Sequence, residues 1–285
     1  MDLIHYEKAK EISDEVLGFA KKIVKKGARI VEIAESIEKK IVSLGGGLAF
    51  PVNVCLNDIA AHYSPFKEDE SELKEGDLVK VDFGVHVNGY IWDRAFSVVI
   101  GRGDETLIDA SAKAVERALE VAKAGKRVDD ISEVIEKTLK EFNVNPIVNL
   151  SGHGIERYKP HSYPTIPSIK TGNKFVLKKG AVIAIEVFTT RGEGTVVETD
   201  TVSIYQYLAD KPVRSFTARK ILRVAKEEFK GLPFARRWIH NIGEKTLVDM
   251  SLKELVLRGC LKEYPVLREK SNSVVAQTEE TVIIR

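Results

Sequence analysis

Apolar residues recur at helical spacing in four stretches of the chain, which are arranged as two pairs. Residues 6–26 and 31–44 form the first pair, and glycine follows each stretch. Residues 105–124 and 128–142 form the second pair, with Gly125 between them. Apolar residues three or four positions apart share one face of a helix, and glycine is frequent at helix ends. The pattern therefore predicts two pairs of helices, each with one apolar face to bury.

Segments with strand character follow both helical pairs. The segment VKVDFGVHVNGYIWDRAFSVV, residues 79–99, has the pattern of a β-hairpin, and residues 180–188 and 195–205 are rich in β-branched and apolar residues. The order helix, helix, strands thus occurs twice. This repeat predicts an α+β fold in which an internal duplication packs helices on a curved antiparallel sheet.

The chain changes character between residues 207 and 269. Helical segments such as TARKILRVAKEEF and MSLKELVLRGCL are interrupted there by Pro212, Gly231 and Pro233. Strand character returns in SNSVVAQTEETVIIR, residues 271–285. We therefore expect an inserted helical subdomain at 207–269 and a main domain formed by 1–206 and 270–285.

Composition narrows the functional classes. The 285 residues are 44% hydrophobic, which is enough for a substantial core. Their 44 basic and 42 acidic residues nearly cancel, so no global signal indicates nucleic acid or an acidic membrane surface. Cys55 and Cys260 lack zinc-knuckle spacing and are too few for a disulfide framework. With no signal peptide or membrane-length apolar run, the sequence predicts a cytoplasmic protein whose two thiols are buried and reduced.

Two aspartates in the predicted hairpin are the first indication of a metal site. Asn88-Gly89 is a preferred type I′ turn pair, so Val87 should lie opposite Tyr90. In this register Asp93 faces Gly84 and is a diagonal neighbour of Asp82, roughly 7–8 Å away on the same face. Two like charges in an apolar strand pair repel each other, and a bound cation is the simplest compensation.

Further acids occur in strand-like segments. Glu186 interrupts the apolar run AVIAIEVF, where a lone buried carboxylate would be costly unless it were protonated or paired with a cation. Glu279 and Glu280 lie in another predicted strand, and because adjacent strand residues face opposite ways, only one of them can join a given site. Periodicity does not choose between these two.

Three histidines are candidates for the same site. His153 lies between Gly152 and Gly154, which allow an irregular backbone, and imidazole beside carboxylates suits a first-row divalent ion. His62 and His161 stand near prolines in predicted loops. Because His161 follows His153 by eight residues, too far for an i, i+4 helical metal pair, a role beside the ligands or facing the substrate is favoured over ligation by His161. The remaining histidines are expected to be surface or packing residues: His5, His86 and His240.

The order and local contexts of Asp82, Asp93, His153, Glu186 and Glu279 resemble those of the methionine aminopeptidases, which have the pita-bread fold. The matching segments span nearly the whole chain: NDIAAHYSP, VDFGVHVNGYIWDRAF, GHGIERYKPH, AIEVFTTRGEG and AQTEET. The stretch between Glu186 and Glu279 resembles the insertion of the type II subfamily, and the beginning of the chain resembles that of archaeal members. The resemblance also selects Glu279 over Glu280.

The resemblance implies a hydrolase with two divalent ions, of Co, Mn, Fe or Zn, that removes the N-terminal methionine from nascent chains with a small second residue. The implied ligands are Asp82, Asp93, His153, Glu186 and Glu279. Asp93 and Glu279 would bridge the ions, Asp82 would complete one shell, and His153 and Glu186 would complete the other. A nascent-chain substrate also raises the expectation of a ribosome partner, although no motif supports one.

Catalytic and pocket residues follow from the same resemblance. Glu186 would also relay a proton, His161 would hydrogen-bond the scissile peptide, and His62 would orient the substrate or stabilise the developing negative oxygen. Phe50, Tyr264 and Ile204 would line the methionine pocket. The vertebrate members have histidine where this chain has Ile204 and alanine where it has Pro233, so the shape of the pocket is expected to differ.

Two rival functions share the fold. A proline-specific dipeptidase would have the same five ligands but normally carries an additional N-terminal domain, for which this chain is expected to have no room. A non-catalytic relative that binds RNA or ribosomes would have lost its metal ligands. The presence of all five implied ligands argues against this second rival.

Overall fold

The computed structural model describes residues 3–285 and has the expected α+β architecture. The helices are α1 (Leu3–Ile23), α2 (Ile30–Ser43), α3 (Thr106–Val121), α4 (Val128–Glu141), α5 (Phe216–Glu227), the 3-10 helix η1 (Arg236–Ile242) and α6 (Lys245–Leu257). The strands are β1 (Gly47–Leu48), β2 (Asn53–Leu56), β3 (Ile59–Ala61), β4 (Leu78–Val87), β5 (Tyr90–Val99), β6 (Asn145–Pro146), β7 (Ser151–Glu156), β8 (Lys159–Pro167), β9 (Val182–Thr190), β10 (Val196–Tyr207), β11 (Phe234–Ala235), β12 (Leu261–Glu269) and β13 (Val275–Ile283).

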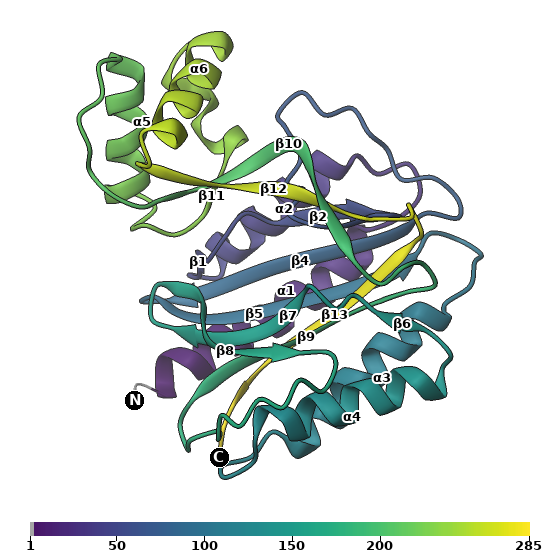
Figure 1. Ribbon diagram of the computed structural model, residues 1–285. Coiled ribbons are helices and arrows are strands. Elements are labelled where there is room, and N and C mark those ends of the chain that lie inside the picture. The colour runs from purple at the N-terminus through teal and green to yellow at the C-terminus, as the bar shows by residue number, and fades with distance from the viewer. Residues whose placement is uncertain (1–2) are drawn as a thin grey trace.

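A nine-stranded antiparallel sheet forms the centre of the molecule. Its main path runs β1-β4-β5-β13-β9-β7-β8, with β2 paired to β4 and β6 paired to β9. The C-terminal strand β13 thus lies between the strands of the first half and those of the second. Helix α1 packs against β4 and β5, and α3 packs against β9 and β13 (Figure 1). The duplicated arrangement of helices on a curved sheet is therefore confirmed.

The β4–β5 hairpin has the predicted register. Val87 pairs with Tyr90 and Gly84 with Asp93. The two turn residues have positive φ, 51° at Asn88 and 84° at Gly89, as a type I′ turn requires. Turn chemistry alone thus placed Asp82 and Asp93 on one face of the sheet.

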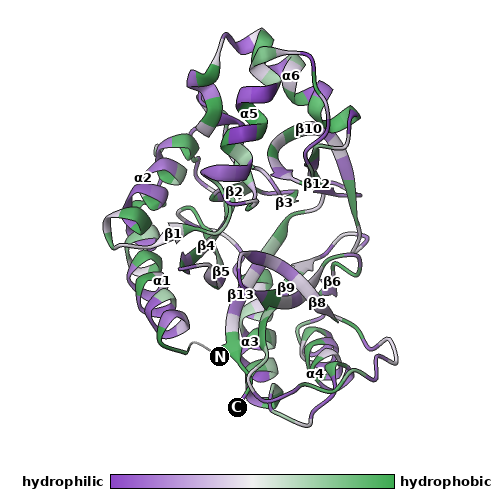
Figure 2. Ribbon diagram, turned by 90° about the vertical axis from the view of Figure 1, so that its left-hand side faces the viewer, coloured by the Kyte–Doolittle hydropathy of each residue, from purple (hydrophilic) through white to green (hydrophobic). Residues whose placement is uncertain are grey.

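Residues 207–269 contain more than helices. Strand β12 pairs with β10 and with β3, so a segment of the expected insertion shares a four-stranded sheet, β11-β10-β12-β3, with the main domain. Helices α5 and α6 pack on this sheet and stand apart from α1–α4 in both views (Figures 1 and 2). The insertion is mixed in structure, and its independence as a folding unit stays a prediction.

His153 and His161 were expected in irregular or loop segments, but both lie in strands. His153 is in β7 and His161 in β8, and these strands pair with each other. The glycines beside His153 serve close strand packing: a Cβ on Gly152 would lie 2.4 Å from the Ala184 carbonyl oxygen, and one on Gly154 would lie 2.3 Å from that of Tyr163. Glycine here therefore indicates contact between backbones, not a loop.

The remaining predictions concern exposure and packing. Cys55 and Cys260 are buried free thiols, as expected. His5 stacks on Tyr90, His86 packs edge-on against Tyr158, and the Nδ1 atom of His240 lies 2.8 Å from the Arg237 carbonyl oxygen. No helix within residues 3–285 is long and apolar enough to cross a membrane.

Candidate metal centre

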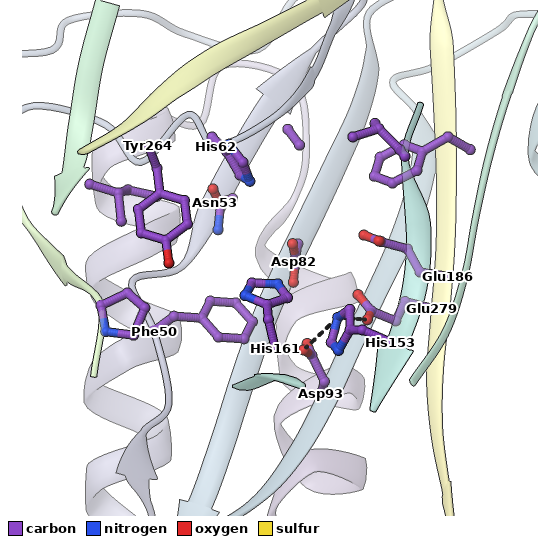
Figure 3. Close-up of a pocket in the computed structure, with 15 residues that line it drawn as sticks. Phe50, Asn53, His62, Asp82, Asp93, His153, His161, Glu186, Tyr264 and Glu279 are labelled. Atoms are coloured by element: carbon purple, nitrogen blue, oxygen red, sulfur yellow. Dashed lines mark ion pairs between the residues drawn. The ribbon is translucent and has the colours of Figure 1, made fainter. Parts of the chain in front are cut away.

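One cavity of about 70 Å³ collects the chemical groups that the sequence singled out. Its lining includes four acids, His153 and His161 from strands of the central sheet, His62 from the loop after β3, and several apolar side chains (Figure 3). These lining residues are Asp82, Asp93, Glu186, Glu279, His62, His153, His161, Phe50, Ile204 and Tyr264. All of the predicted site residues thus lie around one cavity, although they span more than two hundred positions of the chain.

Neighbouring strands bring the acids together. Asp82 on β4 and Asp93 on β5 share a sheet face through the hairpin register. Glu279 on β13 pairs directly with Glu186 on β9 and, on its other side, with Ala95, the cross-strand partner of Asp82. The central position of β13 therefore places Glu279 between the acids of the two halves.

The atoms that could bind a metal ion form two overlapping sets. One oxygen or nitrogen from each of Asp93, His153 and Glu279 lies within 4.8 Å of the others, and the same holds for Asp82, Glu186 and Glu279. The His153 Nε2 atom lies 3.6 Å from Glu279 Oε1 and 3.9 Å from Asp93 Oδ2. Glu279 belongs to both sets. Glu186 is grouped with Asp82, whereas the resemblance pairs it with His153.

Burial disfavours the ionised form of these acids unless a counter-charge is present. Asp93 is 2% exposed and Glu279 is 3% exposed. Burial raises the pKa of Asp93 well above its usual value, and the charges of Asp82 and Glu186 add to the effect. Burial, followed by the charges of Asp93 and Glu186, raises the pKa of Glu279 in the same way. Each carboxylate thus opposes ionisation of the next.

The donor set fits divalent cations. Three buried carboxylate oxygens have no hydrogen-bond partner within residues 3–285: Asp82 Oδ1, Asp93 Oδ1 and Glu279 Oε1. Burial lowers the pKa of His153 to about 4, which keeps its imidazole neutral and able to ligate. Oxygen ligands with one imidazole suit first-row divalent ions. These residues could therefore hold one or two such ions.

The structure also identifies a residue that the sequence reasoning missed. The Gln277 amide donates to Glu186 Oε1 at 2.8 Å and lies 3.5 Å from Asp82 Oδ2. Gln277 precedes Glu279 by two positions on β13, so both side chains lie on the same face of the strand. The two-residue spacing from Glu279 is the feature of the sequence from which the role of Gln277 could have been inferred. The amide orients carboxylates that could bind metal, as partners of ligands commonly do.

Glu280 points to the opposite face of β13. Its carboxylate binds the Arg94 guanidinium at 2.6 Å and accepts a hydrogen bond from Trp92 Nε1 at 2.8 Å. The structure thus separates two adjacent acids that periodicity could not tell apart.

Two histidines lie at the cavity without belonging to either ligand set. His62 follows β3 with a φ of 66°, and its Nδ1 atom lies 3.1 Å from the Pro265 carbonyl oxygen. A carbonyl only accepts, so Nδ1 carries the proton and Nε2 of the neutral ring is an acceptor. Burial lowers the pKa of His62 to about 4. The His161 ring packs edge-on against His153 at 4.4 Å, and burial followed by the His153 charge lowers its pKa well below the usual value.

The apolar wall of the cavity comes from the second sheet and from the segment after β1. Ile204 and Tyr264 are cross-strand partners on β10 and β12. The Tyr264 hydroxyl donates to Gln206 Oε1 at 2.6 Å, and its ring packs edge-on against His62. Phe50, from the segment after β1, lies on the same side of the acid cluster as Tyr264 (Figure 3). A single apolar side chain of a ligand could therefore lie beside the acid cluster.

Comparison with known proteins identifies the family. The model of metallopeptidase family M24 matches residues 5–206, which is most of the chain. This chain belongs to metallopeptidase family M24. It is 45% identical over 278 residues to a methionine aminopeptidase of Thermococcus onnurineus, covering 97% of this chain and 94% of that protein.

Solved structures agree with the M24 assignment at the level of the fold. A structure described as a thermophilic Arx1 superposes with a TM-score of 0.86 at 20% identity, covering 98% of this chain and 87% of that one. A methionine aminopeptidase from Thermotoga maritima superposes with a TM-score of 0.70 at 22% identity, covering 97% and 90%. The M24 member described here is thus a metallopeptidase with the pita-bread fold.

Proposed function

We propose that this protein is a methionine aminopeptidase that removes the N-terminal methionine from peptides with a small second residue. The main support for the proposal is that one cavity has a cluster of acids and histidines beside an apolar wall. The 45% identity to a methionine aminopeptidase over nearly the whole chain supports it. A peptide would present its first side chain to the apolar wall and its first peptide bond to the acids.

The proposed metal ligands are Asp82, Asp93, His153, Glu186 and Glu279, holding two divalent ions. When bound, such ions lower the pKa of a water and polarise a carbonyl. By the family resemblance, Asp93 and Glu279 would each bind both ions. The presence of Glu279 in both sets of grouped atoms supports this role for Glu279. Mn, Fe, Co and Zn all suit the donors, so availability would decide among them.

Glu186 is the proposed proton carrier. It would accept a proton from the attacking water and deliver it to the leaving amine. Such a group needs a pKa near working pH, and burial followed by the Asp82 charge raises the pKa of Glu186 well above its usual value. The hydrogen bond from Gln277 holds the carboxylate in one orientation.

His161 and His62 would orient the scissile peptide from two sides. A neutral His161 can donate a ring N–H to the carbonyl oxygen, which becomes negative in the transition state. His62 has its Nδ1 proton directed to Pro265, so its Nε2 would accept a peptide N–H. Of the two roles expected for His62, this tautomer favours orientation of the substrate.

Phe50, Ile204 and Tyr264 would form the methionine subsite. All three side chains line the cavity, and Phe50 and Ile204 are buried. An unbranched thioether side chain adapts well to an irregular apolar wall that includes aromatic rings. Pro233 contributes to the same wall, so this position also shapes the subsite.

A cytoplasmic location and nascent polypeptides as substrates accompany this proposal. Ribosome association belongs to it only through substrate logic, because nascent chains expose their first methionine there. The near balance of 44 basic and 42 acidic residues offers no separate indication of direct nucleic-acid binding.

Peptide cleavage in the presence of Mn²⁺ tests the proposal. We expect release of methionine from Met-Ala-Ser, little cleavage of Met-Trp-Ser because the second residue is bulky, and no cleavage of Ala-Pro. Product analysis by mass spectrometry distinguishes these outcomes. Preferential cleavage of Ala-Pro would instead identify a proline-specific dipeptidase, and no cleavage of any peptide would favour a non-catalytic protein.

The non-catalytic alternative receives no support from the cavity. Its expected mark is loss of metal ligands, whereas four acids and His153 remain grouped around one space. The likeness to Arx1, at 20% identity, concerns the fold.

A further inference from the structure

A buried arginine from the insertion contacts the segments that carry two of the proposed substrate-binding residues. Arg237 lies in η1, directly after β11, and is 3% exposed. Its guanidinium binds the Glu38 carboxylate of α2, donates to Ser64 Oγ at 2.5 Å, and donates to the Pro65 carbonyl oxygen at 3.2 Å. One side chain thus joins the insertion to α2 and to the loop after His62.

The same contacts extend to the segment that carries Phe50. Glu38 Oε1 accepts a hydrogen bond from the Val52 amide at 3.2 Å, and Ser64 Oγ donates to the Val52 carbonyl at 2.8 Å. Val52 lies two residues after Phe50. We call Glu38, Val52, Ser64 and Arg237 the Arg237 network. Through Glu38 and Ser64, the network bonds both the backbone N–H and the backbone carbonyl of Val52.

Two further hydrogen bonds, from Trp238 of the insertion and to Ser203 of β10, hold residues of the network in place. Trp238 Nε1 donates to Glu38 Oε2 at 3.0 Å, so Glu38 receives three donors from two segments, η1 and the segment after Phe50. Ser64 N donates to Ser203 Oγ at 3.1 Å, and Ser203 precedes Ile204 of the apolar wall. The loop after His62 is therefore held between the insertion and β10.

We propose that Arg237 is a positioning residue: it fixes the His62 loop and the Phe50 segment against the insertion, so that His62 and the methionine subsite keep their relative geometry. The inference rests on the proposed function for the roles of His62 and Phe50. A lone buried ion pair is weak support for a stabilising role. Here, however, the guanidinium uses its planar array of donors to join separate segments, which a single charge could not do.

Arg236 provides a matched control. It is the preceding residue, is 8% exposed, and binds Asp249 at 2.6 Å entirely within the insertion. Arg236→Met removes a buried arginine and its ion pair with the half-exposed Asp249, and neither residue lines the cavity. Arg237→Met removes the guanidinium's bonds to Glu38, Ser64 and Pro65 and leaves Glu38 buried without its cation. The double variant Glu38→Gln/Arg237→Met removes that uncompensated charge and still leaves the loop without its contacts.

Three measurements on the full chain test the proposal: kcat and KM for Met-Ala-Ser with Mn²⁺, melting temperature, and backbone hydrogen exchange over residues 52–66. For Arg237→Met we expect a lower melting temperature and a fall in kcat/KM of roughly ten- to a hundred-fold, the scale of small misplacements near a reacting bond. In the double variant the melting temperature should recover while kcat/KM stays low and exchange stays fast. Arg236→Met should keep wild-type kcat/KM and wild-type exchange in this segment.

Recovery of kcat/KM together with melting temperature in the double variant would overturn the proposal, since Arg237 would then act on stability alone. Equal losses in Arg236→Met and Arg237→Met would overturn it as well. If the double variant fails to fold, Arg237→Lys replaces it. This variant keeps the charge beside Glu38 but lacks the planar donors, so we expect near wild-type melting with reduced kcat/KM, and wild-type kcat/KM would contradict the proposal.

Hydrogen exchange separates this inference from the proposed function. If the wild-type protein releases no methionine, the proposed function fails. The physical claim about Arg237 is still decided by exchange over residues 52–66, which should rise in the Arg237 variants and remain at the wild-type rate in Arg236→Met.

Discussion

Glu279→Ala is expected to abolish peptide hydrolysis and to release bound metal. Glu279 is the one residue in both sets of grouped ligand atoms, so its removal affects each ion. Loss of several kcal/mol of charge stabilisation by metal corresponds to a fall in kcat of roughly a thousand-fold or more. Metal content by atomic absorption and kcat on Met-Ala-Ser measure the two effects in parallel.

Glu280→Gln is the matched control for Glu279→Ala. Glu280 is the next residue along β13, but its carboxylate binds Arg94 and Trp92 on the opposite face. Its loss should lower the melting temperature, because Arg94 is nearly buried, while kcat and metal content stay close to wild type. Retained metal and activity in Glu279→Ala would contradict the ligand assignment, and loss of metal in Glu280→Gln alone would reverse the choice between the two acids.

His153→Ala and His161→Ala are expected to fail in different ways. Both rings line the same cavity and lie 4.4 Å apart, but only His153 is grouped with carboxylates. His153→Ala should lose metal affinity and activity together. His161→Ala should keep its metal while kcat falls roughly a hundred- to a thousand-fold, the usual effect of removing one donor to a developing oxyanion.

Calorimetric titration of each histidine variant with Mn²⁺, followed by turnover at saturating metal, separates the two roles. The proximity of the rings makes this comparison sharp, since general damage to the cavity would affect metal and turnover alike. If His161→Ala lost metal affinity as severely as His153→Ala, the division between a ligand and a substrate-binding histidine would be wrong.

Local chemistry explains which parts of the fold were predictable. Asn88-Gly89 set the hairpin register because its turn type needs two positive φ values, and the structure has them. Glu186 was identifiable because a carboxylate in an apolar run needs a compensating charge. In contrast, β7 and β8 were missed because their glycines and prolines resemble loop signals, whereas the glycines beside His153 permit close contact between strands.

Residues that act through long-range contacts left little trace in the sequence. Gln277 is a neutral amide, and its importance depends on β13 lying between β5 and β9, a pairing that no local pattern specifies. Arg237 stands beside Arg236 in FARRWIH, where two adjacent cations suggest a solvated surface. Only the packing of the insertion against α2 and the His62 loop distinguishes the two arginines.

The most direct test of the metal-dependent aminopeptidase is titration of chelator-treated protein with Mn²⁺ while methionine release from Met-Ala-Ser is followed. We expect no release without metal, activity that rises with added Mn²⁺, and saturation by two bound ions per chain. Full activity in the metal-free protein, or no methionine release at saturating Mn²⁺, would contradict a metal-dependent aminopeptidase.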